Sequence, residues 1–165
     1  MVRRPSAFEG IPLPRLNGGI PLSSPLTAYN GLLFIFHLIL GASTLGVGAL
    51  NLNRPLYRPV AIVENNSSWI TAHVLTQCGS INLTVSTALF FFISAFFHFG
   101  NAFFWRKCYL RGIRFCWCPS RWIEYTFSAG LMSILIAYSA GVVMLDSVIA
   151  IFALTSVTMF FGYCT

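Results

Sequence analysis

Charged side chains are scarce in this chain, and the scarcity limits what the protein can be. Only 8% of the 165 residues are charged, four of them are Asp or Glu, and Lys107 is the single lysine, whereas 56% are hydrophobic. So few polar groups cannot cover the surface of a soluble domain that buries this much apolar material. The composition therefore excludes a soluble globular protein and predicts an all-α integral membrane protein, with the lipid bilayer as its main partner.

The net charge of +6 is the one feature that could suggest a nucleic-acid partner. The basic residues lie in short clusters beside apolar runs, which is where basic residues orient a protein in a bilayer. We therefore predict no nucleic-acid partner. The chain also shows no nucleophile, paired carboxylates or metal-ligand spacing within its apolar runs, so we predict neither an enzyme nor a metal site.

Four apolar runs approach the length of about 20 residues that crosses the hydrocarbon layer. They cover about residues 31–50, 83–105, 122–143 and 148–163, and together they predict a transmembrane domain over residues 31–165. Residues 1–30 are rich in Pro, Gly and Ser and predict a flexible tail. The first run is too long for a cleaved signal peptide, so we expect it to stay as a transmembrane span.

The connections predict the orientation of the chain. Residues 51–80 contain two β-rich segments, 60–63 and 69–74, on either side of an Asn-Asn-Ser-Ser turn, which predicts a β-hairpin. Residues 106–121 hold five basic residues; with the three in the tail, one side of the membrane carries eight and the other two. Since positive loops stay in the cytoplasm, the N-terminus is predicted to be cytoplasmic and the hairpin loop external.

Glu124 needs an explanation because it follows the start of the third apolar run. An ionised carboxylate inside a membrane costs several kcal/mol unless it faces a polar cavity or a partner. Arg121 lies three residues earlier on the same helical face and could form an intrahelical ion pair with it. The alternative is that Glu124 is the counterion of a buried cation, and the residues alone leave both interpretations open.

Two histidines are expected at a similar depth to Glu124. His37 lies about eight residues, or ~12 Å of helix, from the cytoplasmic end of its span, and His98 precedes Arg106 by eight residues on a span of opposite direction. A lone His among aromatic residues is more often a satisfied interior residue than a functional one. Further polar or polarisable residues follow at helical spacing: Ser94 is one turn from His98, and Ser128 and Met132 are one and two turns after Glu124.

The third run, Arg-Trp-Ile-Glu-Tyr-Thr-Phe-Ser-Ala from Arg121 to Ala129, resembles the corresponding span of the heliorhodopsins, a divergent family of microbial-type retinal proteins. Other elements are similar to that family too: a cytoplasmic N-terminus, a β-hairpin in the first external loop, His37 in the first span, and a Ser-x-x-x-His pattern at Ser94 and His98. The likeness extends from about Tyr29 to Thr165, and the third-span motif is its most specific part.

The resemblance implies a seven-helix photoreceptor that carries all-trans retinal. It implies Glu124 as counterion of the protonated Schiff base, His37, His98 and Ser94 in the cavity beside it, and Ser128 and Met132 in the retinal pocket. A homodimer is also suggested by the family resemblance, and Gly41, Gly46 and Gly48 form a small-residue face that would permit packing.

The chain departs from the family in its lysine. Heliorhodopsins attach retinal to a Lys in the seventh helix, whereas Lys107 lies in a predicted cytoplasmic loop. The expectation is therefore the N-terminal four-helix part of a seven-helix bundle, without the last three helices and without covalent retinal on this chain. The alternative is a four-span interaction or scaffold protein that binds no pigment.

Overall fold

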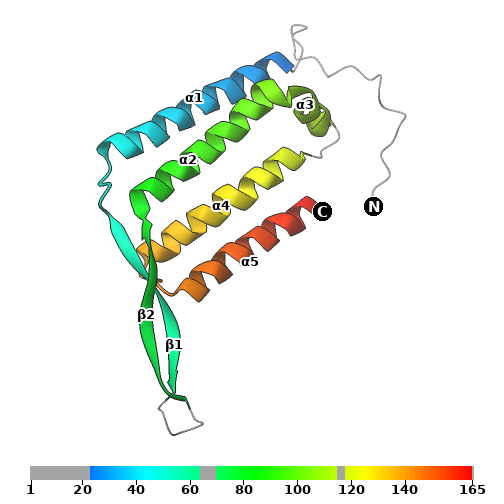
Figure 1. The fold of residues 1–165 in the computed structure, drawn as a ribbon. Helices are drawn as coiled ribbons and strands as arrows, with labels where there is room; N and C mark the ends of the chain where they lie inside the picture. The colour runs from blue at the N-terminus through cyan, green and yellow to red at the C-terminus, as the bar shows by residue number, and fades with distance from the viewer. Residues whose placement is uncertain (1–22, 64–69, 115–117, 165) are drawn as a thin grey trace.

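The computed structural model describes residues 23–63, 70–114 and 118–164. Four long helices lie side by side in chain order, a β-hairpin projects from one end of them, and a short helix lies at the other end (Figure 1). The elements are α1 (Ser23–Val47), β1 (Asn53–Val63), β2 (Ile70–Asn82), α2 (Leu83–Phe99), the π-helical turn η2 (Gly100–Phe104), α3 (Arg106–Arg114), α4 (Pro119–Ser139) and α5 (Leu145–Cys164). The mostly helical fold with one hairpin is as predicted.

Three segments of the described residues are long and apolar enough to cross a membrane. They are Ser24–Val47, Leu83–Phe104 and Leu145–Cys164, which correspond to the first, second and fourth predicted spans. The third predicted span corresponds to α4, which is 21 residues long but more polar, with Arg121 and Glu124 in its first two turns. The fold therefore contains three helices with the character of membrane spans and a fourth, more polar helix packed between two of them.

The first helix begins earlier than the sequence suggested. Residues 1–22 of the predicted tail lie outside the described residues, but residues 23–30, which were expected to be irregular, form the first two turns of α1. The expectation relied on Pro25, yet a proline in the first turn of a helix removes no intrahelical hydrogen bond. The helix also ends at Val47 and not at Leu50.

The basic connection is not irregular, since residues 106–114 form α3. Residues 106–121 are predicted from the sequence as one loop, because the nine residues of this helix are too few to show a periodic pattern clearly. The next helix, α4, begins at Pro119, a favoured first position, and ends at Ser139, earlier than the expected Val143. Gly141 then adopts a φ of 97°, which suits the turn into α5.

The predicted hairpin is present and is longer than expected. The two strands are antiparallel and pair from Asn53 with Asn82 to Val63 with Ile70; the Asn-Asn-Ser-Ser turn lies outside the described residues. Asn82 also caps α2, because its side chain accepts a hydrogen bond of 2.9 Å from the Val85 amide. The second strand thus leads directly into the second helix.

A buried tyrosine connects the base of the hairpin to the helices. The Tyr138 hydroxyl, from the end of α4, donates to the carbonyls of Arg54 and Pro55 in β1, and the Pro55 bond is 2.8 Å long. Leu56 of β1 packs with Tyr138 and Val148 in a small buried cluster. These contacts hold the hairpin against the turn between α4 and α5.

Glycines allow α1 and α2 to approach closely. A Cβ atom on Gly41 would lie 2.7 Å from the Phe92 ring, and one on Gly48 would collide with Thr84. Only Gly46 of the expected small-residue face has open space around it. Two of the three glycines therefore contact residues of the same chain. Little of the small-residue face remains for packing against a second copy of the protein.

Candidate functional site

Glu124 is a buried acid between α4 and α2. Its side chain is 8% exposed, and the Ser94 hydroxyl of α2, itself 5% exposed, interacts with its carboxyl group. A buried carboxylate needs hydrogen bonds or an opposite charge to remain ionised. The α2–α4 interface supplies the first of these through Ser94.

The ion pair with Arg121, the competing interpretation of Glu124, does not form. Arg121 is exposed; its Nε donates to the Tyr125 hydroxyl at 3.0 Å, and its guanidinium carbon lies 5.3 Å from the Tyr125 ring centroid. Arg121 contributes to the electrostatic environment of Glu124 without contacting it as a salt-bridge partner. Within the described part of the chain, Glu124 is a buried acid with no cation in contact.

His37 and His98 come together between α1 and α2. Their ring centroids are 5.2 Å apart, with an interplanar angle of 33°. His37 Nδ1 lies 2.8 Å from the Leu33 carbonyl oxygen, which can only accept, so this nitrogen carries the proton. In the neutral ring the Nε2 atom of His37 is then an acceptor.

Asn30 holds His98 in the same tautomer. The Asn30 amide nitrogen donates to the Leu26 carbonyl at 2.9 Å, and its Oδ1 lies 3.1 Å from His98 Nδ1. Because Oδ1 only accepts, His98 Nδ1 is the donor and Nε2 is left as an acceptor in the neutral ring. Asn30 is not among the residues predicted for the site. It is 2% exposed, and its place seven residues, or two helical turns, before His37 was the signal that could have identified it.

The predicted site residues thus form two groups joined by α2. His98 pairs with His37, and Ser94, one turn earlier on the same helix, interacts with Glu124. The Ser128 hydroxyl is buried and donates to the Glu124 backbone carbonyl at 2.9 Å, so its hydrogen bond is satisfied within its own helix. Met132 is half-buried one turn further along α4.

A second polar group missed by the sequence analysis closes one end of α2. Asn101, 5% exposed within η2, accepts through Oδ1 from Trp105 Nε1 at 2.7 Å and from the Ser120 hydroxyl of α4 at 3.1 Å. Asn101 follows His98 by three residues, so both lie on one side of the helix, and this spacing could have identified Asn101 as a site residue. Single turns of π-helix often occur at functional sites, and this one joins the end of α2 to the start of α4.

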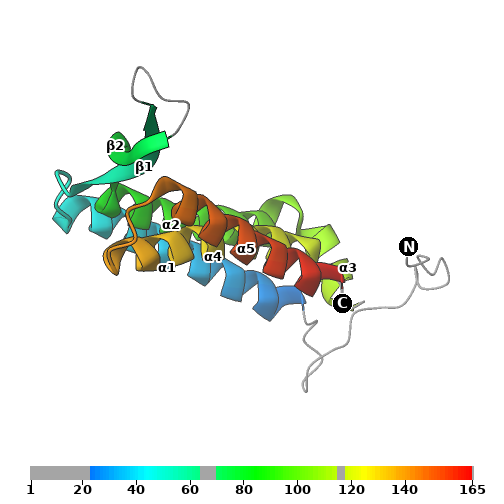
Figure 2. The same ribbon diagram turned by 90° about the horizontal axis from the view of Figure 1, so that it is seen from below.

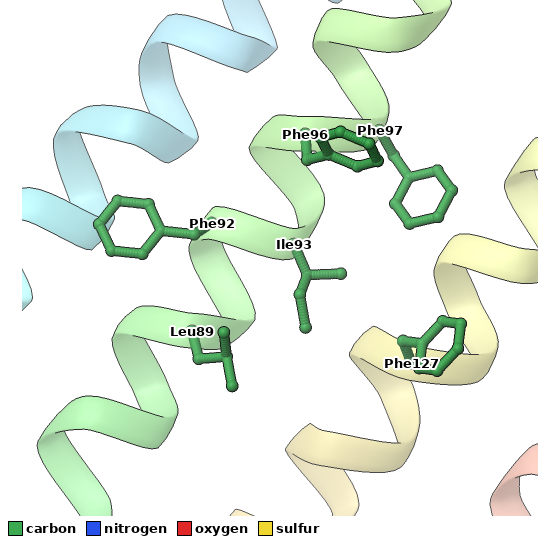
Figure 3. Close-up of a pocket in the computed structure, with 6 residues that line it drawn as sticks. All are labelled: Leu89, Phe92, Ile93, Phe96, Phe97 and Phe127. Atoms are coloured by element: carbon green, nitrogen blue, oxygen red, sulfur yellow. The ribbon is translucent and has the colours of Figure 1, made fainter.

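An apolar groove lies near the polar groups but contains none of them. Figure 3 shows its lining side chains, which come from α2 and α4: Leu89, Phe92, Ile93, Phe96, Phe97 and Phe127. Neither Ser128 nor Met132 lines it. A surface without polar groups cannot orient a ligand by hydrogen bonds, so the polar groups around Glu124 and the histidines are the better candidate site.

A bundle of apolar helices, with a buried acid and two paired imidazoles among its described residues, is typical of an integral membrane protein with polar groups in its interior. The heliorhodopsin family model matches residues 26–165, and the chain belongs to that family. No curated protein matches the chain. Family membership indicates a retinal-binding, light-sensing membrane protein of a kind that is not a classical enzyme.

Proposed function

We propose that this chain forms the counterion side of a heliorhodopsin-like photoreceptor, with Glu124 compensating the protonated Schiff base of all-trans retinal. The observation that carries the proposal is the burial of Glu124 beside Ser94 without a contacting cation among the described residues. An acid in this position fits a cationic ligand, because an opposite charge lowers the cost of keeping a carboxylate ionised in a membrane interior.

The neighbouring residues support this role from α1 and α2. Retinal bound through its aldehyde carbon to a lysine amine would supply a cationic, protonated imine and a light-absorbing polyene. Ser94 donates to the carboxyl group of Glu124, while His37 and His98 offer Nε2 atoms that can accept a hydrogen bond or a proton. Ser128 and Met132, one and two turns beyond Glu124, are proposed to border the retinal pocket.

Lys107 is unsuited to carry the chromophore. It is exposed on α3, at the end of the helices, whereas Glu124 is buried between α2 and α4. We propose that the Schiff-base lysine is supplied from outside these 165 residues, as the last three helices would supply it in a seven-helix bundle.

The test of the counterion uses a complete pigment, formed by supplying lysine-bearing helices from a heliorhodopsin. Glu124→Gln should shift the absorption maximum to longer wavelength and lower the pH at which the imine deprotonates. A contacting unit charge at ~4 Å and an effective dielectric constant of about 20 contributes about 4 kcal/mol, or roughly three pH units. Arg121→Gln is the matched control and should change the spectrum little.

The outcomes separate the two candidate functions. If Glu124→Gln leaves both the spectrum and the titration unchanged, Glu124 is not the counterion. If the wild-type complex binds no retinal, the chain is better described as a four-span interaction or scaffold protein, and the counterion proposal is wrong. Homodimerisation stays a prediction from the family resemblance.

We further propose that α4 is a fourth membrane span and that the N-terminus is cytoplasmic. Two observations support this: α4 packs between α2 and α5, both candidate spans, and basic α3 lies at the opposite end of the helices from the hairpin (Figures 1 and 2).

Single cysteines introduced into a chain without native Cys test this topology. In intact cells, an impermeant thiol reagent should label Thr76→Cys on the hairpin and leave Lys107→Cys on α3 unlabelled. Permeabilised cells provide the control for the reactivity of both positions. The reverse labelling pattern would refute the proposed orientation.

A further inference from the structure

The short helix α3 has a position that its sequence alone did not reveal. Its nine residues would extend about 14 Å, too little to cross a bilayer. Figures 1 and 2 place it at the end of the long helices, between the ends of α2 and α4. If α2 and α4 cross the membrane, α3 lies at the membrane surface.

The residues of α3 divide into an inner and an outer face. Tyr109, Leu110 and Ile113 are half-buried, whereas Lys107 and Arg111 are exposed and lie one turn apart on the same side. A helix with one apolar face and one basic face suits the boundary between lipid tails and headgroups.

The positive charge of α3 has no acidic partner in the described part of the chain. The acids there are Glu124, which is buried, and Asp146 in the first turn of α5, at the hairpin end of the helices. Lys107 and Arg111 therefore repel each other without compensation. The Nε atom of Arg106, the first residue of α3, is buried and has no hydrogen-bond partner among the described residues, so it is not part of the exposed basic face.

We propose that α3 binds the phosphate headgroup of an anionic phospholipid in the leaflet that it borders, through Lys107 and Arg111. The apolar face keeps the helix at the depth of the headgroups, and the basic face supplies the charge complementarity. Clusters of Lys and Arg beside a membrane span are attracted to anionic lipids at that depth. This inference concerns the lipid surface and is independent of retinal binding.

The experiment reconstitutes the full chain in nanodiscs of phosphatidylcholine and phosphatidylglycerol, extracts it in mild detergent, and measures the co-purified lipids by mass spectrometry. Wild type should be enriched in phosphatidylglycerol over the bulk mixture. Lys107→Gln with Arg111→Gln should reduce this enrichment by about fivefold for each charge removed. Raising the salt concentration should reduce it in the wild type, because exposed charges are screened.

Matched variants distinguish a site on α3 from a general effect of charge. Arg54→Gln with Arg58→Gln removes the same charge from exposed positions on the hairpin and should keep the enrichment. Lys107→Arg with Arg111→Lys conserves the charge and should keep it as well. Circular dichroism establishes that each variant retains its helices, and the salt dependence of the wild type tests the proposal even if the α3 variant misfolds.

Three results would overturn the proposal. The first is a co-purified lipid composition of the wild type that equals the bulk mixture. This result would favour an acidic protein surface, and not a lipid, as the partner of the basic face. The second is equal loss of enrichment in the α3 and hairpin variants. The third is thermal stabilisation by inorganic phosphate, in phosphatidylcholine nanodiscs, as large as that by phosphatidylglycerol, which would assign the site to a free anion.

Discussion

Replacing Tyr138 with Phe tests whether the hairpin is held to the helices by one hydroxyl group. Tyr138 is 2% exposed, and its hydroxyl is shared between the carbonyls of Arg54 and Pro55. The substitution keeps the ring that packs against Leu56 and Val148, so it removes the hydrogen bonds with almost no change in packing. The hairpin should then separate from the bundle more often, while the long helices stay intact.

The size of the effect follows from the two hydrogen bonds. A neutral hydrogen bond contributes about 0.5–1.5 kcal/mol net, and a buried carbonyl left without a donor costs about 1–3 kcal/mol. The two carbonyls are adjacent, so a single water molecule could recover part of the loss. We expect Tyr138→Phe to lower the free energy of hairpin opening by about 2 kcal/mol, which raises the open population about 30-fold.

Limited proteolysis of purified protein in bicelles measures that population, provided that the hairpin recloses faster than it is cleaved. Cleavage within β1 and β2 should accelerate in Tyr138→Phe and remain at the wild-type rate in Tyr29→Phe. Tyr29 is a suitable control because it is 60% exposed and its hydroxyl has no partner among the described residues. Equal cleavage rates in the two variants would refute the anchoring role of Tyr138.

Two further predictions concern the lysine and the paired histidines. Expression of this chain alone with all-trans retinal, followed by borohydride reduction and mass spectrometry, should find no retinyl group on Lys107. A retinyl group on Lys107 would contradict the proposal that this lysine does not carry the chromophore. Asn30→Leu should remove the acceptor of His98 Nδ1–H and destabilise the protein by about 1–3 kcal/mol, whereas Asn30→Asp keeps an acceptor. Nitrogen-15 NMR of the imidazoles should show the Nδ1–H tautomer of His98 in wild type and Asn30→Asp, and a mixture of tautomers in Asn30→Leu.

Much of this protein can be read from local patterns in the sequence. The apolar runs identify three helices with the character of membrane spans because length and hydrophobicity are properties of a continuous segment. The β-rich segments around an Asn-Ser turn predict the hairpin for the same reason. The motif around Glu124 identifies the heliorhodopsin family, which the family match confirms.

Which polar residues contact each other is determined by the tertiary structure. Arg121 and Glu124 are three residues apart, as an ion pair requires, yet Arg121 bonds Tyr125 and Glu124 meets Ser94 from another helix. The partnership of Asn30 with His98 joins residues 68 positions apart. Such contacts depend on how far each helix is rotated and shifted against its neighbour. Spacing along one helix contains no information about either quantity, because they are set by packing between helices, such as that of Gly41 against Phe92.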